Sequence, residues 1–429
     1  MVSVSRMVRT SMIPARAATA VLTRNSRFGP SEEATVEAIF RSLSTLKGGP
    51  TKLGQVLATF EPAIPPHLVG PYRKALNDLT DSTAPVPLSD MSLSVSQLPA
   101  SVQVSGPAFA AASIGQVHQG FFSTGSGDVP VAVKLQYPDM DKMLRSDAAQ
   151  IRMLAYGLRK LTGVDFSELV SAHVEAMLDE LDYELEAHTQ QRFFDAYSSL
   201  PAAAVLVTVP QVRFSSQLSL VTDFHPGVAL SRVEPGTPAA DRLGTLLLTY
   251  TLANPALVGL VHGDPHPGNF LLGADSKLVA LDYGAASPAS GYTDVFARSA
   301  LAIAGSDMTS AFHMWRDFGL VSSDTTLEAF VATVPTKPDP LGGSPYDTDG
   351  FRFSPEWLGA QASGFYSPSS AADVSVRFAL PPDALLEHRA LMGTIALLCK
   401  LRARVPFNTL LHAYPDPSAM FSVASNFLS

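Results

Sequence analysis

Charge, tryptophan and cysteine are scarce in this sequence. Only 16% of the 429 residues are charged and only two are tryptophan. The single cysteine, Cys399, excludes an internal disulfide and favours a reducing compartment. It lies in the apolar run Leu397–Cys399, which predicts a buried core thiol. A net charge of -9 argues against nucleic-acid binding, because phosphate backbones are bound through clustered Lys and Arg.

The sequence also lacks an uninterrupted apolar run of membrane-spanning length. The nearest candidate, Leu243–Val261, contains Asn254 and Pro255 and leads directly into a polar segment. A core helix therefore explains this run better than a spanning helix does. We expect no transmembrane anchor, so that any contact with a membrane would be peripheral.

The first 30 residues contain five arginines and no acidic residue. This composition is typical of a mitochondrial transit peptide, but the segment has no clear amphipathic helix. A basic N-terminal tail, able to touch anionic lipid, is the preferred interpretation. We expect a cytoplasmic protein with peripheral membrane contact, and a mitochondrial origin stays open.

A helical, a strand-rich and a second helical segment follow one another along the chain. Residues 31–95 are expected to form a helical extension and a Pro- and Ser-rich linker. Residues 96–226 contain β-type runs, a hairpin signal at Ser123–Asp128 and one long acidic helix from Asp165 to Tyr197. Residues 227–429 are mostly helical. This order predicts an α+β, protein-kinase-like fold with a small β-rich N-lobe and a helical C-lobe.

The polar segment His262–Asn269, followed by Leu281–Gly284, carries the strongest functional pattern. Phosphoryl transfer depends on alignment and on charge neutralisation, mostly by Mg²⁺. Asn269 and Asp282 would supply metal-binding oxygens, and Asp264 would orient or deprotonate the attacking group. The spacing from Asp264 to Asn269 matches a kinase catalytic loop, and Asp282 falls where the metal-binding Asp of a kinase should lie.

The plain alternative is a polar turn between two buried segments, with the histidines as capping groups. Two matching motifs in order and at the proper distance argue against that alternative. We interpret His262 as a structural brace of the loop. His266 is either a packing residue of the loop or a contact to phosphate or substrate.

The segment Val131–Lys134 has the form of the strand that carries a phosphate-gripping lysine. Burying an unpaired ammonium is costly, so Lys134 needs a partner. The acidic run Asp179–Glu186 offers one, with Asp182 and Glu186 expected on one helix face. Alone, such a run would be a solvated helix face. Beside Lys134 and the Mg²⁺ motif, Glu186 becomes the expected ion-pair partner.

The Gly-rich phosphate loop of an ordinary protein kinase is missing. Its place is taken by Ala108–Gln116, in which alanines stand where glycines would let backbone N–H groups approach the phosphates. The added methyl groups predict a stiffer loop and a different nucleotide pose. We therefore do not expect an ordinary protein kinase.

Together these motifs resemble the UbiB family of atypical kinases. Lys52-Leu53-Gly54-Gln55 resembles that family's Lys-x-Gly-Gln motif, and Glu180-Leu181-Asp182 resembles its Glu-x-Asp motif. The resemblance implies nucleotide contacts from Ala110, Ala111, Ala112, Ser113 and Lys134. It implies catalytic roles for Asp264, Lys134, Glu186, Lys52 and Gln55, and a metal site formed by Asn269, Asp282, Glu180 and Asp182.

The resemblance also implies a function. It points to ATP or ADP with Mg²⁺, and to an extension folded over the cleft where a peptide would otherwise bind. The family is linked to isoprenoid-quinone and lipid metabolism and to ATP hydrolysis at membranes. We therefore expect a lipid or quinone-pathway small molecule as partner, and a homodimer is left open. Tyr283 departs from the family by replacing the usual Phe, which would add a hydrogen bond.

Two other functions stay open. A small-molecule phosphotransferase of the aminoglycoside or choline kinase kind shares the His-Gly-Asp-x-x-x-x-Asn loop, but predicts neither the Lys-x-Gly-Gln extension nor the Ala-rich loop. A nucleotide-gated scaffold would bind a lipid or a partner protein with little turnover. The intact catalytic and metal-site residues argue against a dead site.

Overall fold

The computed structural model describes residues 85–111, 114–145, 178, 181–334, 344–346, 350–366 and 379–429. The chain divides into two compact units. The first ends at Glu186 and includes Val212–Phe224, and the second consists of Ala187–Gln211 and His225–Ser429. The boundary falls within helix α8 (Tyr183–Ser199).

The first unit is built on a five-stranded antiparallel sheet with the order β1-β2-β3-β6-β5. Its strands are β1 (Val102–Ala111), β2 (Gly115–Thr124), β3 (Gly127–Gln136), β5 (Val212–Ser216) and β6 (Ser219–Asp223). Thr124 pairs with Gly127 across a tight turn, which confirms the predicted hairpin. The sequence did not predict β5.

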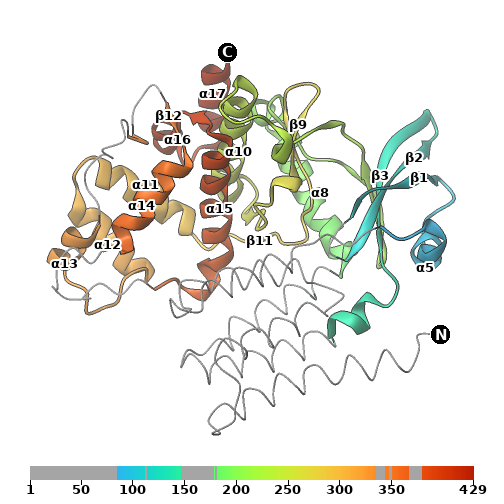
Figure 1. Cartoon of the computed structure of the whole chain (residues 1–429), viewed down its shortest axis with the longest axis horizontal. Helices are drawn as coiled ribbons and strands as arrows, with labels where there is room; N and C mark the ends of the chain where they lie inside the picture. Colours follow the sequence, from blue (N-terminus) through green and yellow to red (C-terminus); the bar gives the residue numbers. More distant parts are fainter. Residues whose placement is uncertain are drawn as a thin grey trace, which may run out of the picture. The chain divides into compact units, whose positions relative to one another are not determined.

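The two faces of this sheet differ. Along β3 the fully buried side chains are those of Val131, Val133 and Leu135. The short helices η3 (Leu88–Met91) and α5 (Ser92–Val95) contribute apolar side chains to this core, and Met91 is buried in it. Figure 1 shows α5 beside the sheet. Because successive side chains of a strand alternate, Ala132 and Lys134 lie on the opposite face, where both are half-buried.

The predicted uninterrupted helix from Asp165 to Tyr197 is wrong at Leu181 and Asp182. Leu181 lies in a turn, and α8 begins only after Asp182. The Asp182 Oδ1 accepts two backbone N–H groups of the first turn of α8, at 3.1 and 2.9 Å. This is the arrangement of an N-cap residue. Asp182 therefore precedes α8 and does not share a helical face with Glu186.

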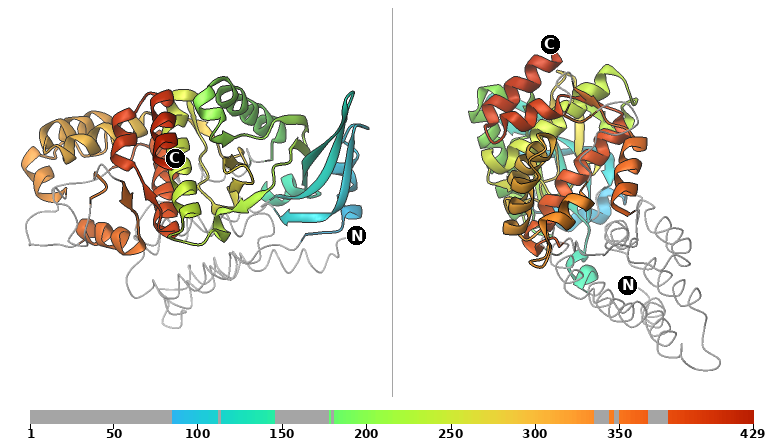
Figure 2. Two further views of the ribbon diagram at one scale, coloured as in Figure 1. Left: turned by 90° about the horizontal axis from the view of Figure 1, so that it is seen from above. Right: turned by 90° about the vertical axis from the view of Figure 1, so that its left-hand side faces the viewer.

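The second unit is mostly helical, as predicted. Its helices in the described residues include α9 (Pro201–Ala204), α10 (Pro238–Leu257), α11 (Tyr292–Ala304), α12 (Met308–Phe318), α13 (Leu327–Thr333), α14 (Pro355–Tyr366), α15 (Leu385–Leu401), α16 (Phe407–Ala413) and α17 (Pro417–Leu428). Helix α10 packs against α15 and α17, and Figures 1 and 2 show the three side by side.

Helix α10 confirms the core-helix interpretation of the longest apolar run. Its residues from Leu243 to Tyr250 are buried, and Thr237 caps its start by accepting the backbone N–H of Ala240 at 3.3 Å. Cys399, on α15, is 1% exposed in the same core. Burial raises the pKa of this thiol to about 12, in agreement with the predicted core thiol. No helix among the described residues has both the length and the apolar character needed to cross a bilayer.

Short strands position the polar loops of the second unit. A four-stranded sheet has the order β4 (Val207–Thr208), β10 (Leu278–Ala280), β9 (Phe270–Gly273) and β7 (Gly227–Ala229). Two smaller pairs are β8 (Leu260–Val261) with β11 (Ser287–Pro288) and β12 (Phe351–Arg352) with β13 (Arg404–Val405). The predicted catalytic segment connects β8 to β9, and the predicted metal aspartate follows β10.

Candidate active site

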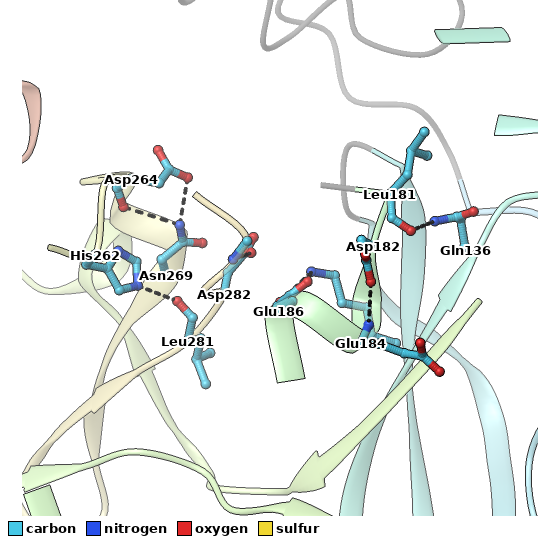
Figure 3. A network of polar contacts seen from close by, with 12 residues as sticks. Gln136, Leu181, Asp182, Glu184, Glu186, His262, Asp264, Asn269, Leu281 and Asp282 are labelled. Carbon is cyan, nitrogen blue, oxygen red and sulfur yellow. Dashed lines mark hydrogen bonds and ion pairs between the residues drawn. The ribbon is translucent and has the colours of Figure 1, made fainter. Parts of the chain in front are cut away.

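One backbone hydrogen bond and one side-chain hydrogen bond join the loop after β8 to the loop after β10 in the second unit. The backbone N–H of Leu281 donates to the carbonyl oxygen of Asn269 at 2.9 Å. The Nε2 of His262 donates to the carbonyl oxygen of Leu281, also at 2.9 Å. Figure 3 shows His262 below the loop and in contact with Leu281. His262 thus braces the loops from beneath, as predicted.

The His262 ring is packed in an aromatic cluster. Its centroid lies 5.1 Å from that of Tyr283 and 5.2 Å from that of Phe270. Burial lowers the pKa of His262, because the charged imidazolium is disfavoured away from water. The Tyr283 hydroxyl donates to the Ala280 carbonyl at 3.4 Å and accepts from the Tyr250 hydroxyl at 3.4 Å. The expected extra hydrogen bond of Tyr283 is therefore confirmed.

Gly263 shapes the entry to the catalytic segment. Its φ of +76° lies in the left-handed region, and a Cβ there would overlap the carbonyl oxygen of Ala285. Only glycine combines this backbone conformation with so close an approach. The sequence therefore fixes the loop geometry one residue before Asp264.

Asp264 is held on both carboxylate oxygens. The Asn269 amide nitrogen donates to Oδ2 at 2.8 Å, and an Arg389 Nη donates to Oδ1 at 3.1 Å. The Asp264 side chain is only 12% exposed, so these contacts are only partly screened by water. A charge-assisted hydrogen bond of this kind fixes the direction of a carboxylate. The oxygens of Asp264 are thereby aimed before any substrate arrives.

The sequence did not reveal Arg389, because it lies 125 residues from Asp264. It occupies the first part of α15, beside an apolar stretch that begins at Ala390. In the sequence, the one sign of a role for Arg389 is that a charged residue directly precedes an apolar stretch. One turn later Gly393 lets α15 approach the loop, since a Cβ there would overlap the ring of Pro265. Helix α15 thus supports the catalytic segment at two points.

Asp282 has an unusual backbone. Its φ is +62°, a value that non-glycine residues rarely adopt. Its Oδ1 accepts the backbone N–H of Gly284 at 3.4 Å. Strain of this sort persists where the surrounding structure requires it, and such positions are concentrated at functional sites.

The oxygen atoms of this loop suit Mg²⁺. The Asn269 amide nitrogen faces Asp264, so its carbonyl oxygen is directed elsewhere and can act as a ligand. Asp282 contributes a carboxylate from the neighbouring loop (Figure 3). One carboxylate and one amide oxygen, completed by phosphate oxygens and water, form the type of shell that Mg²⁺ prefers.

In the first unit, the predicted ion pair is present. The Lys134 Nζ lies 2.9 Å from both carboxylate oxygens of Glu186. The two side chains are 15% and 3% exposed, and the ammonium also lies 5.0 Å from the centre of the Tyr183 ring. An ion pair with so little access to water is costly to break, because one charge would stay buried.

Of the remaining predicted site residues, three lie within the described part of the chain and five lie outside it. Ala110 and Ala111 form the end of β1, and Ala110 shares a cross-strand row with Val117 and Lys134. Asp182 caps α8, as described above. Those that lie outside the described residues are Lys52, Gln55, Ala112, Ser113 and Glu180.

Comparison with known proteins decides the family. Residues 102–314 match the ABC1 atypical kinase-like domain. This chain belongs to the UbiB/AarF family of atypical kinase-like proteins. The match contains the Lys134–Glu186 pair and both loops that carry Asp264, Asn269 and Asp282. A UbiB/AarF assignment also agrees with the α+β fold described above, with a five-stranded sheet in the first unit and mostly helices in the second.

Three relatives illustrate the range of this UbiB/AarF family. The chloroplast protein ACTIVITY OF BC1 COMPLEX KINASE 1 of Arabidopsis thaliana is 31% identical over 42% of this chain and 27% of its own. The mitochondrial atypical kinase COQ8 of Schizosaccharomyces pombe is 25% identical over 90% of this chain and 64% of its own. A structure of Rv3197 of Mycobacterium tuberculosis in complex with erythromycin is 29% identical, with a TM-score of 0.64, over 90% of this chain and 97% of that chain.

This chain therefore spans between about a quarter and two thirds of the length of those curated relatives. The shared part includes the kinase-like domain, and it supports a kinase-like protein that uses ATP.

Proposed function

We propose that this chain binds Mg²⁺-ATP and transfers or hydrolyses its terminal phosphoryl group. Lys134, held by Glu186, would bind phosphate oxygens. Asn269 and Asp282 would hold the metal, which when bound neutralises phosphate charge. Asp264 would orient a water molecule or an acceptor hydroxyl and receive its proton.

The observation that carries this proposal is the fixed direction of Asp264 and Asn269. The amide nitrogen of Asn269 is engaged by Asp264, so its oxygen is presented as a hard ligand beside the carboxylate of Asp282. If the loop were only a polar turn between two buried segments, the contact of Arg389, from α15, with the Asp264 carboxylate would have no purpose. Catalysis of phosphoryl transfer is mostly positioning and electrostatics, and this arrangement supplies both.

We further propose that the acceptor belongs to isoprenoid-quinone or lipid metabolism and is met at a membrane surface. The resemblance of the motifs to the UbiB family supports this assignment. The chloroplast and mitochondrial relatives are consistent with it, although each is longer than the segment shared with this chain. Contact with the membrane would be peripheral, made in part by the basic N-terminal tail.

A second candidate function is the binding of an organic molecule with little turnover. It is favoured by the Rv3197 complex, in which a protein of similar length and fold holds erythromycin. Turnover is favoured instead by the Lys134–Glu186 pair and by the carboxylates of Asp264 and Asp282. A buried ion pair and a strained backbone both cost folding free energy, and a catalytic role explains why they are present.

The test is phosphate release from ATP by the purified full chain, with and without anionic liposomes. The chemical proposal predicts Mg²⁺-dependent release that is lost in Asp282→Asn and kept in Asp275→Asn, a change at a 56% exposed aspartate. The membrane proposal predicts faster release with liposomes. Release equal to that of Asp282→Asn in both conditions would favour the binding function.

A further inference from the structure

Glu387 is a buried acidic residue that the proposed chemistry does not use. It lies in the first turn of α15, and the whole residue is only 1% exposed. Acidic residues are almost never fully buried unless they are paired, because a carboxylate loses its hydration in the interior. The groups that compensate the Glu387 carboxylate therefore indicate its role.

Three hydrogen bonds compensate this carboxylate. Its Oε2 accepts the backbone N–H of Ser290 at 2.6 Å and the Ser290 hydroxyl at 2.7 Å. Its Oε1 accepts the backbone N–H of Thr293 at 2.9 Å. Burial alone would raise the pKa of Glu387, but the hydrogen bonds from Thr293 and Ser290 outweigh burial, and the pKa is lowered. The carboxylate is therefore ionised at neutral pH.

The groups that Glu387 accepts lie at the start of α11. Ser290 precedes this helix, and Thr293 lies in its first turn. The N-cap residue of α11 is Gly291, which has no side chain that could accept these N–H groups. Glu387 supplies the acceptor from another helix, and its negative charge lies where the dipole of α11 favours an anion. The start of α11 is thereby attached to α15.

This attachment closes a short segment that contains Asp282. We call residues 281–290 the metal loop. At one end the backbone N–H of Leu281 is bonded to Asn269, and at the other end Ser290 is bonded to Glu387. Between the two ends β11 pairs with β8. Because the metal loop is short, loss of the anchor at its far end would let the strained backbone of Asp282 relax.

The same turn of α15 also holds Asp264. Arg389 follows Glu387 by two residues and donates to Oδ1 of Asp264 at 3.1 Å. Successive residues of an α-helix are turned by about 100°, so residues two apart point in different directions. One turn of α15 therefore holds the catalytic segment on one side and the end of the metal loop on another.

We propose that Glu387 is a positioning residue, which keeps Asp282 in its metal-binding position by fixing Ser290 and the start of α11. The proposal rests on the proposed function, in which Asp282 holds Mg²⁺. Glu387 touches neither metal nor nucleotide in this account and acts through the backbone of the metal loop. Its loss should therefore weaken the effect of Mg²⁺ on ATP binding more than it weakens the binding of ATP alone.

The experiment combines hydrogen–deuterium exchange with calorimetric titration of ATP at a series of Mg²⁺ concentrations, on the full chain. Glu387→Gln keeps the shape of the side chain and removes its charge, and Ser290→Ala removes one of the three donors. The matched control is Asp307→Asn, which makes the same change from acid to amide at the residue that caps α12. Thermal unfolding checks that each variant is folded at the temperature of measurement.

In Glu387→Gln the backbone amides of the metal loop should exchange about tenfold faster, because hydrogen bonds to a charged group are weakened. The Mg²⁺ concentration that gives half of the gain in ATP affinity should rise about tenfold, as for other residues that support a metal ligand. ATP binding without Mg²⁺ should change less than about twofold. Ser290→Ala should give smaller changes in the same direction, and Asp307→Asn should leave the metal loop as it is.

Unchanged exchange of the metal loop in a folded Glu387→Gln chain would overturn the inference. Faster exchange with an unchanged Mg²⁺ dependence would overturn it as well, since Glu387 would then only cap α11. Both results leave the proposed function standing. If the unaltered chain binds no ATP at any Mg²⁺ concentration, the proposed function fails first and this inference falls with it.

Discussion

Arg389 of α15 donates to Oδ1 of Asp264 at 3.1 Å, while the amide of Asn269 donates to Oδ2 at 2.8 Å. The carboxylate is therefore held from two directions, once by its own loop and once by a helix far along the chain. Arg389 touches no reacting atom in this arrangement and acts through Asp264. We regard it as a positioning residue.

Replacing Arg389 by Ala should lower kcat for phosphate release by about 10- to 100-fold, because small displacements of a catalytic group have effects of that size. The KM for ATP should change little, since Arg389 is not assigned to nucleotide binding. Arg389→Lys should recover part of the rate by keeping the charge. Arg298→Ala, at an exposed ion pair with Asp294, is the control. Equal losses of kcat in the two alanine variants would show that Arg389 has no special role.

The Lys134–Glu186 pair should behave as a buried unit. Lys134→Met alone leaves the 3% exposed Glu186 carboxylate without this ammonium, and should cost about 3 kcal/mol of unfolding free energy. The double variant Lys134→Met/Glu186→Gln removes both charges and should be more stable than the single variant. Chemical denaturation measures both values. Additive losses in the double variant would contradict the predicted coupling.

Gly263 and Gly259 provide a matched pair for backbone strain. Their φ values are +76° and +72°, but a Cβ at Gly259 would meet no atom within 4 Å, whereas one at Gly263 would overlap Ala285. Gly259→Ala should cost about 1–2 kcal/mol from the left-handed backbone alone. Gly263→Ala should cost about 2 kcal/mol more and also reduce turnover, because the loop must shift. Comparable losses of stability in the two variants would be inconsistent with the close approach at Gly263.

His262 should make stability depend on pH. Its pKa is lowered from 6.5 by burial, so the unfolded chain takes up a proton at a higher pH than the folded chain does. The stabilisation is complete above the unfolded value and is lost as the pH falls through it towards the lowered folded value. Unfolding free energies at about pH 7 and about pH 5 should therefore differ more for the unaltered chain than for His262→Gln. His388, whose pKa is also lowered by burial, leaves a remaining slope in both proteins.

Residues close in sequence or linked by a motif were predictable. Asp264, Asn269 and Asp282 stand at spacings that reflect the two neighbouring loops on which they lie. The order of strands and helices gave the fold class, and the strand alternation around Lys134 indicated that an acidic partner was required. In each case the local sequence pattern and the chemistry of the residues point to the same structure. The three-dimensional structure then adds the distances between the atoms.

The parts that could not be predicted depend on tertiary packing. Asp182 was predicted to be helical because acidic residues occur both on helix surfaces and at helix caps. The turn at Leu181, which precedes α8, shows that Asp182 is a cap residue. Arg389 has no spacing signal, since its partner lies 125 residues away. The rings of Phe109, on β1, and Phe224, at the end of β6, meet edge-on with centroids 5.9 Å apart, and strand alternation alone does not specify this contact.

Calorimetric titration of ATP, with and without Mg²⁺, tests whether Asp282 holds the metal of Mg²⁺-ATP. If it does, Mg²⁺ should strengthen ATP binding to the unaltered chain and to Asp275→Asn, and this gain should disappear in Asp282→Asn. An Asp282→Asn chain that still binds ATP more tightly with Mg²⁺, by the same factor as the unaltered chain, would contradict a metal-binding role of Asp282.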